Sequence, residues 1–323
     1  MSQQTVLYDS PGPRARRVTL IVSAVVTVLL AIGAYFLVYR PLDEKGQFDL
    51  ELWGPLLDPS NEVFSLVWAR LLEGFQATLI AAVLAIITSL IVGTALAVLR
   101  VELKALMKRR FVGQSRPVAI ALRTLTVVLN GITRFCVEVF RGLPVVVTIF
   151  FVATALPDLG LDLGSILWYL VIGLTLYNSV VIGEILRSGM EGLPGGQREA
   201  AEAIGLSSFA TIRLILLPQA FRIMLPALIS QLVVVLKDTS LGFIISYEEV
   251  LRVSSFVISN LENPIQVYFV VAVIYIAVNY ALSKLAEYVQ RRLARGRKTG
   301  TLRRAKDTPP AALAADLTPP AKL

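Results

Sequence analysis

The sequence of 323 residues contains no histidine and a single cysteine, Cys136. Without histidine, the chain lacks the imidazole groups that most often bind metal ions and carry protons near neutral pH. One cysteine excludes an internal disulfide and leaves no cysteine cluster for a metal site. We therefore expect Cys136 to be buried and inert, and we expect the chain to use no cofactor.

Sequence motifs of enzymes are missing as well. No G-x-x-x-x-G-K-[ST] loop occurs, so the chain cannot itself cradle the phosphates of ATP. It has neither a nucleophile elbow nor a pair of zinc ligands at the usual spacing. We expect no enzymatic activity, and any ATP hydrolysis that drives this protein must come from another polypeptide.

Charged residues are also scarce: they make up 17% of the chain, and 55% is hydrophobic, whereas soluble domains carry about 25% charge. Six apolar runs reach the roughly 20 residues that a membrane-spanning helix needs: residues 18–39, 75–99, about 127–156, 165–187, 223–246 and 265–286. The start of the third run is ambiguous because four charges interrupt it, Arg123, Arg134, Glu138 and Arg141. The first run is too long for a secretory signal and has no cleavage site, so it is expected to remain as a span. The composition predicts an all-α integral membrane protein with about six transmembrane helices.

The distribution of Lys and Arg predicts the orientation, because cytoplasmic loops collect these residues. Basic clusters precede the first span and follow the second and the sixth: Arg14, Arg16 and Arg17; Lys104, Lys108, Arg109, Arg110 and Arg116; Arg291, Arg292, Arg295, Arg297 and Lys298. Residues 40–73 carry seven acidic and three basic side chains. Both termini are therefore expected in the cytoplasm. The net charge of +8 is then explained by the positive residues retained on the cytoplasmic side, where anionic lipid headgroups are their natural partner. It requires no nucleic acid partner.

The segment EAAEAIGLSSFATIRLILLP, residues 199–218, lies between the fourth and fifth spans. It predicts a short helix that ends at Gly205 in the left-handed region, followed by a second helix capped by Ser207 or Ser208. Pro218 is expected to stop that second helix. Composition alone also fits an amphipathic interfacial hairpin that merely connects two spans.

The spacing within this segment is specific. It reads E-A-A, three residues, Gly, nine residues, Ile, one residue, Leu-Pro, and the matching residues are Glu199, Ala200, Ala201, Gly205, Ile215, Leu217 and Pro218. This pattern resembles the EAA loop of the permease subunits of bacterial ABC importers. The resemblance implies that these seven residues couple the permease to its ATPase.

Two further stretches resemble the polar amino acid branch of that family. They are EVFRGLPVVVTIFF, residues 138–151, and LPQAFRIMLPALISQLVVVLKDTSL, residues 217–241. Among the subunits of this branch, glutamate permeases are the most similar. The resemblance implies an importer domain over residues 71–290, preceded by a cytoplasmic segment (1–17), an extra span (18–39) and an acidic external loop (40–70), and followed by a basic, disordered tail (291–323).

The resemblance further implies partners and a mechanism. The chain would pair with itself or a homologous permease, dock two ATPase subunits and receive an amino acid from an extracytoplasmic binding protein in the bacterial cell membrane. Import would proceed by alternating access. A secondary transporter driven by an ion gradient is the alternative, although no internal repeat supports it, and a membrane scaffold would leave the EAA pattern unexplained.

Several polar residues within the spans are further candidates. Arg141, Gly142 and Pro144 mark a structural bend, and Arg141 could also face a polar cavity. Glu184 is expected to pair with Arg187 three residues later, and Asn178 could line the cavity.

The KDTS stretch, Lys237, Asp238, Thr239 and Ser240, falls roughly halfway across the hydrocarbon core. Neighbouring residues on a helix do not face each other, so each of the two charges needs its own partner or water. We expect a break in the helix here, at the border of the translocation pathway or its gate. A buried network between subunits is the alternative.

Overall fold

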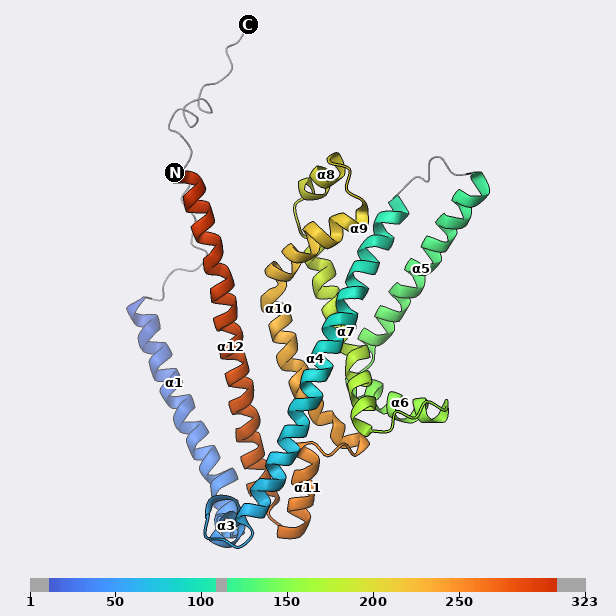
Figure 1. Cartoon of the computed structure of the whole chain (residues 1–323). Helices are drawn as coiled ribbons and strands as arrows, with labels where there is room; N and C mark the ends of the chain where they lie inside the picture. The colour runs from blue at the N-terminus through green and yellow to red at the C-terminus, as the bar shows by residue number, and fades with distance from the viewer. Residues whose placement is uncertain (1–11, 109–114, 307–323) are drawn as a thin grey trace.

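The computed structural model describes residues 12–108 and 115–306, and every regular element within them is helical (Figure 1). The elements are α1 (Pro13–Ala34), the π-helical turn η1 (Tyr35–Tyr39), α2 (Arg40–Glu44), α3 (Leu50–Leu57), α4 (Phe64–Lys108), α5 (Arg116–Gly142), α6 (Val145–Asp158), α7 (Ile166–Glu191), α8 (Gly196–Ala203), α9 (Ser208–Thr211), the π-helical turn η2 (Ile212–Leu216), α10 (Leu217–Asp238), the 3-10 turn η3 (Thr239–Ile245), α11 (Val250–Leu261) and α12 (Pro264–Lys306). The predicted all-α fold class is confirmed.

Six helical segments in the described residues are long and apolar enough to cross a membrane, as predicted. The predicted bounds of the third span, 127–156, are wrong. That span is α5, which begins at Arg116 and ends at Gly142, and residues 145–158 form the separate helix α6. The break arises at Leu143 and Pro144, both of which have extended backbone, and a proline restricts the residue before it to such conformations.

Two other expectations about the chain also need correction. Cys136 is exposed on α5 instead of buried, because α5 packs against the rest of the chain along one face only. The tail is not irregular from residue 291 onward, since α12 continues to Lys306; the stretch up to that point contains no proline to stop it. Residues 307–323, and Arg109 and Arg110 of the second basic cluster, lie outside the described residues.

The centre of the molecule is the contact between α4 and α7. The face of α4 toward α7 carries small residues at intervals of four: Ala81, Ala85, Ser89, Gly93 and Ala97. An added Cβ at Gly93 would lie 2.7 Å from the carbonyl oxygen of Ser179 on α7. Small residues let transmembrane helices approach this closely, and the resulting van der Waals contact replaces the hydrophobic drive that is absent in lipid.

The segment between α1 and α4 is fixed to the end of the bundle by hydrogen bonds. Buried Asn263 donates to the carbonyl oxygen of Leu52 at 2.9 Å, and buried Gln266 at the start of α12 donates to that of Gln47 at 2.7 Å. The indole of Trp68 on α4 donates to Leu56 at 3.1 Å. Helix α3 is thereby held against both α4 and α12.

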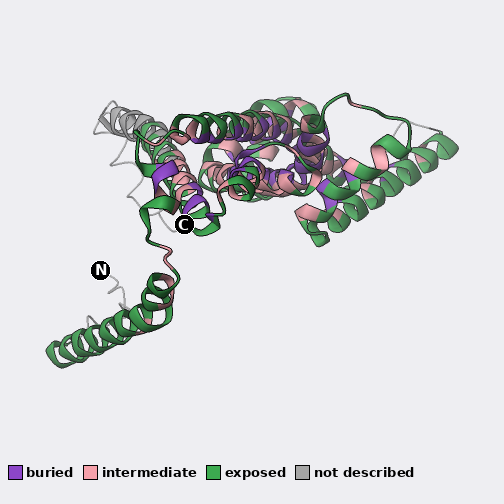
Figure 2. Ribbon diagram, turned by 90° about the horizontal axis from the view of Figure 1, so that it is seen from below, coloured by how far each residue is buried: buried purple, intermediate pink, exposed green. Residues whose placement is uncertain are grey.

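Helix α1 stands apart from this bundle. None of its residues is buried, and the view in Figure 2 shows it as an exposed arm that meets the other helices only through the α3 segment. From Val18 onward α1 carries no charged residue, and a helix of this kind that stands alone is suited to a lipid surround.

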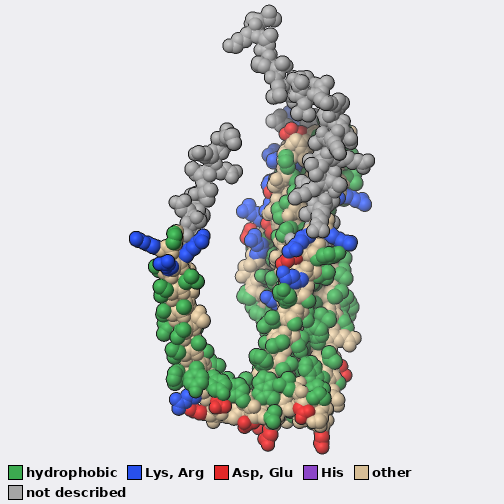
Figure 3. Space-filling model, turned by 90° about the vertical axis from the view of Figure 1, so that its left-hand side faces the viewer, with side chains coloured by type: hydrophobic (Ala, Val, Ile, Leu, Met, Phe, Trp, Pro, Cys, Tyr) green, Lys and Arg blue, Asp and Glu red, His purple; other side chains and the backbone are tan. Residues whose placement is uncertain are grey.

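Charge divides the molecule into two ends (Figure 3). Lys and Arg gather at the end where α1 begins and α4 stops, and this basic end also carries α8 and α9 (Figure 1). Asp and Glu gather at the opposite, acidic end, around α3 and α11. The described ends of the chain, at α1 and α12, both lie at the basic end (Figure 1).

Candidate functional site

Helices α8 and α9 form a hairpin at the basic end, and Gly205 makes the turn between them. Gly205 has φ +79°, and the backbone N–H groups of Gly205 and Leu206 donate to the carbonyl oxygens of Glu202 and Ala201 at 3.0 Å each. This pair of bonds is the Schellman motif, which requires a left-handed residue and so favours glycine. The predicted helix end at Gly205 is confirmed.

Serines fix the start of α9. The hydroxyl of Ser207 accepts a hydrogen bond from the backbone N–H of Ala210 at 3.2 Å, which caps the helix as predicted. The hydroxyl of Ser208 donates to a carboxylate oxygen of Glu102 on α4 at 2.6 Å. The hairpin is thus joined by a side-chain bond to the long helix α4.

Residues of the EAA pattern divide between the surface and the interior. Glu199 and Ala200 are exposed on α8, whereas Ala201 is only 1% exposed. Ile215 and Leu217 pack against a buried cluster that α4, α7, η2 and α10 share. The pattern therefore supplies both an outer surface and the anchor that holds it.

The expected helix end at Pro218 is wrong. The chain passes from α9 through the π-helical turn η2 directly into α10, whose first turn contains Pro218. In the π turn the N–H of Leu217 donates to the carbonyl oxygen of Ile212, five residues earlier. The shifted register puts Pro218 at the start of a helix, where its missing N–H is tolerated. Consequently the second helix of the hairpin is continuous with the fifth span.

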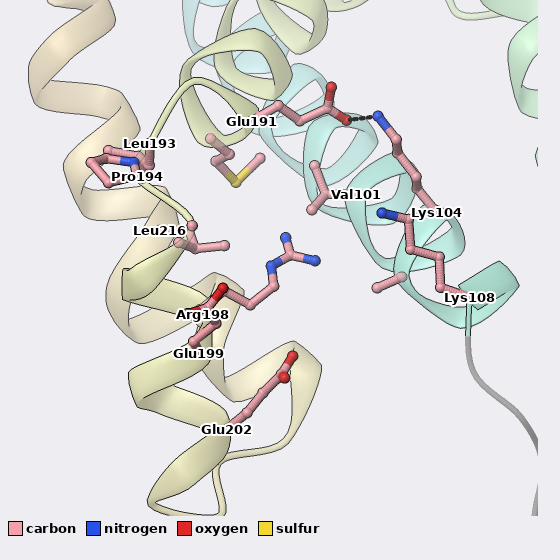
Figure 4. Close-up of a pocket in the computed structure, with 13 residues that line it drawn as sticks. Val101, Lys104, Lys108, Glu191, Leu193, Pro194, Arg198, Glu199, Glu202 and Leu216 are labelled. Atoms are coloured by element: carbon pink, nitrogen blue, oxygen red, sulfur yellow. Dashed lines mark hydrogen bonds and ion pairs between the residues drawn. The ribbon is translucent and has the colours of Figure 1, made fainter.

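A pocket of about 380 Å³ separates α8 from the ends of α4 and α7 (Figure 4). Its charged lining residues are Lys104, Lys108, Glu191, Arg198, Glu199 and Glu202. The side chain of Arg198 reaches from α8 into this space (Figure 4). The pocket beside the hairpin therefore contains both positive and negative side chains.

An ion-pair network beneath this pocket joins α4 to α7. The expected pair of Glu184 with Arg187 is confirmed at 2.9 Å. Glu191 also pairs with Arg187, four residues earlier on the same helix, at 2.8 Å. Sequence reasoning missed the two pairs that cross to α4, Arg100 with Glu184 and Lys104 with Glu191 at 2.9 Å. Arg100 and Glu184 are 16% and 17% exposed. Partners more than 80 positions apart cannot be identified from helical spacing.

The expected helix break at the KDTS stretch is confirmed, because α10 ends at Asp238 and the 3-10 turn η3 begins at Thr239. Lys237 is exposed, and one carboxylate oxygen of Asp238 is buried with no hydrogen-bond partner among the described residues. Thr239 and Ser240 donate to carbonyl oxygens of the preceding turn at 2.6 and 2.7 Å. Whether this stretch borders the pathway stays a prediction.

Asn178 is fully buried between α7 and α10. Its amide donates to the carbonyl oxygen of Leu174 at 3.0 Å, and its oxygen accepts from Gln231 of α10 at 2.7 Å. Within this chain Asn178 thus joins two helices, and its part in a cavity stays a prediction.

Arg141 and Gly142 are the last residues of α5, and Pro144 precedes α6. Helix α6 then runs crosswise to α5 (Figure 1). The three residues lie at a sharp change of direction, and their functional role stays a prediction.

Comparisons with known proteins agree with these features. The family model for the inner membrane component of binding-protein-dependent transport systems matches residues 117–295. The glutamate transport system permease protein GluD of Corynebacterium glutamicum is 38% identical over 259 residues, which are 79% of this chain and 85% of the relative. The probable glutamine ABC transporter permease protein GlnP of Bacillus subtilis is 36% identical over 50% of this chain and 76% of its own length.

Solved structures share the fold. An amino acid ABC transporter crystallised with histidines has a TM-score of 0.56 at 23% identity, over 72% of this chain and 99% of that one. An inward-facing MetNI methionine ABC transporter has a TM-score of 0.54 at 18% identity, over 72% and 99%. In such transport systems the permease does not hydrolyse ATP, which is the task of a separate chain. The family match, the identity to GluD and the hairpin show that this chain is a multi-pass membrane protein belonging to the permease subunits of ABC importers for polar amino acids.

Proposed function

We propose that this permease imports glutamate or a close relative by alternating access, in a complex with a second permease, two ATPase subunits and a binding protein. The second permease is another copy of this chain or a homologue. Glutamate is supported by GluD, whose name states a glutamate transport system. The relative GltK of Escherichia coli, named as a glutamate/aspartate import permease, is 28% identical over 69% of this chain and 93% of its own length.

The observation that carries the mechanism is the continuity between the hairpin and the core. The outer face of α8 is exposed, while η2 and α10 continue from α9 into a cluster that includes Ala97 of α4 and Leu186 of α7. A docked ATPase that moves α8 would therefore displace the fifth span and the α4–α7 contact together. This is coupling between two sites through a rigid element.

The coupling role is tested by two substitutions in the assembled complex. Glu199→Lys reverses a charge on the exposed face of α8, and Gly205→Val forces a β-branched residue to adopt φ +79°. Both variants should insert and assemble but lose substrate-stimulated ATP hydrolysis. Gly196→Val is the matched control, since Gly196 has no positive φ and nothing lies within 4 Å of its Cβ position. Normal stimulation in both variants would reduce the hairpin to a connector.

We propose that the basic end faces the cytoplasm, with both termini on that side, because positive residues are retained there. Anionic lipid headgroups would surround this end. Single cysteines in a Cys136→Ala background, at Gln47 and at Gly296, should react with an impermeant reagent from opposite sides of the membrane. Reaction of both from outside would overturn this orientation.

We also propose that the KDTS stretch and Asn178 border the pathway or its gate. The support is the irregular turn η3, because such backbone at membrane depth is tolerated only where it is buried in protein or lines a cavity. Lys237→Met and Asp238→Asn should lose uptake in a complex that still assembles and hydrolyses ATP. Failure to assemble would instead assign the stretch to a structural network.

The overall function is tested by uptake into proteoliposomes. The complex with its ATPase and binding protein should accumulate labelled glutamate only when ATP is supplied, and aspartate or glutamine should compete according to their similarity to the substrate. Uptake that persists without ATP and follows an ion gradient would favour a secondary transporter and refute the proposal.

A further inference from the structure

Helix α5 carries a polar stripe along its whole length. At 100° per residue, six polar side chains fall within about 80° of one another on the helix: Arg116, Arg123, Asn130, Arg134, Glu138 and Arg141. The stripe extends over about 37 Å, more than the thickness of a hydrocarbon core. Four arginines and one glutamate give it a net charge of +3.

The chain itself does not cover this stripe. Its five charged residues are exposed, and Asn130 is half-buried. Within residues 12–108 and 115–306, none of the five forms an ion pair, whereas Glu184 and Arg187 of α7 are both paired. The stripe therefore needs a surround that the described chain does not supply.

The buried residues of α5 show on which side of the helix the stripe lies. Thr126 and Val137 are buried and lie within about 120° of every member of the stripe. Arg134 and Glu138 are close enough to Arg100 of α4 for their charges to act on it. The stripe consequently flanks the contact of α5 with the bundle, while Cys136 lies about 160° away from Arg134 on the helix.

Lipid and a second copy of the stripe are both unsuitable neighbours. An arginine at the centre of a bilayer is costly unless it is paired or hydrated, and the stripe holds several. Two copies of α5 that faced each other along this surface would bring two stripes of net positive charge together, which is repulsive. A water-filled space, in contrast, hydrates arginines at every depth.

We propose that the α5 stripe lines a water-filled pathway and that its arginines select amino acids with a net negative charge. This inference rests on the proposed function, and it adds the residues that determine substrate class. At neutral pH a glutamate molecule carries two carboxylates and one ammonium group, and guanidinium groups form strong charge-assisted hydrogen bonds with carboxylates. A row of arginines would lower the barrier for an anion along the path and raise it for a cation.

Accessibility to water is tested without any transport measurement. In the assembled complex, cysteines at Asn130 and Arg134 in a Cys136→Ala background should react with a sulfonate-bearing methanethiosulfonate about tenfold faster than native Cys136. The ratio of this rate to that of a trimethylammonium-bearing reagent should also exceed the ratio for a free thiol, because the remaining arginines attract the sulfonate. Slow reaction of both stripe cysteines, as slow as that of Cys136, would overturn the proposal by showing that the stripe is covered.

Selection is tested by the choice between glutamate and glutamine, which differ in one charge. Arg123→Gln and Arg134→Gln should each lower the glutamate-to-glutamine uptake ratio by about tenfold. Thr124→Ala, on the same helix but outside the stripe, should leave the ratio unchanged. An unchanged ratio in both arginine variants would overturn the selective role. If the intact complex imports neither amino acid, the proposed function fails, and the labelling result still decides whether the stripe faces water.

Discussion

Helices α7 and α5 are both candidate spans of nearly equal length, 26 and 27 residues, yet their surroundings differ sharply. In an apolar stretch of 18 residues within each helix, 56% of the residues of α7 are buried and 11% of those of α5. Both helices carry charges, but Glu184, Arg187 and Glu191 of α7 are paired with one another and with α4. The charges of α5 form no ion pair with any residue that the structure describes.

This difference teaches that an intramembrane charge can have two opposite purposes. On α7 the charges join two helices within one chain, next to the hairpin that we propose to be moved by the ATPase. On α5 the charges are presented outward, where only water, substrate or another subunit can meet them. Substitutions that remove charge or add bulk should therefore lower the stability of the fold strongly at the α4–α7 contact and only slightly on α5.

The largest effect is expected for Glu184→Gln. Removing this carboxylate leaves Arg100 and Arg187, 16% and 23% exposed, without their shared partner, and breaking a buried ion pair costs about 3–5 kcal/mol. The free energy of unfolding, measured in detergent with a denaturant, should fall by that amount. Glu287→Gln is the control, because its partners Lys284 and Arg291 are mostly exposed and such pairs contribute less than about 1 kcal/mol. Equal losses in the two variants would abolish the distinction.

The next effect is expected for added bulk at Gly93. A valine there would force its side chain against the carbonyl oxygen of Ser179 and the side chain of Ile182, and overpacking costs about 1–3 kcal/mol. Gly131→Val on α5 is the matched control, since nothing lies within 4 Å of its Cβ position. Thermal unfolding should show a lower midpoint for the α4 variant alone. A comparable loss at Gly131 would mean that α5 is tightly packed in the assembled protein.

Features with local causes could be predicted from the sequence. Gly205 and Ser207 determine a turn and a cap through their own backbone and side-chain chemistry. The turn was expected at Gly205, and the cap at Ser207 or Ser208. The prediction at Pro218 was wrong because a proline usually ends a helix. Here the π-helical turn η2 changes the hydrogen-bond register before Pro218, so that the helix continues. The ion pairs of Arg100 and Lys104 with α7 depend on how α4 and α7 pack. No pattern within one stretch of sequence indicates that packing.

A smaller effect is expected for Ser207→Ala in the hairpin that follows α7. The variant removes the acceptor for the N–H of Ala210, and losing a serine cap costs about 1 kcal/mol. Hydrogen exchange of the first turn of α9 should accelerate accordingly, while the α4–α7 contact keeps its protection. Ser259→Ala is the control, because that hydroxyl only donates to a carbonyl of its own helix. Faster exchange throughout α7 would show that the hairpin also stabilises the core, in addition to being held by it.

The smallest effect on stability is expected for Arg134→Gln on α5. Its side chain is exposed and makes no ion pair within the described residues, and glutamine keeps much of its length, so the free energy of unfolding should change by less than about 0.5 kcal/mol. The same variant should nevertheless alter the preference for glutamate over glutamine, because a stripe that meets substrate instead of protein acts on transport and not on folding. Both quantities can be measured on one preparation, by denaturation in detergent and by uptake after reconstitution. A loss above about 2 kcal/mol would show that Arg134 is buried against a partner group in the complex. Arg134 would then resemble Arg100, and the difference between α5 and α7 would hold for the single chain but not for the assembled complex.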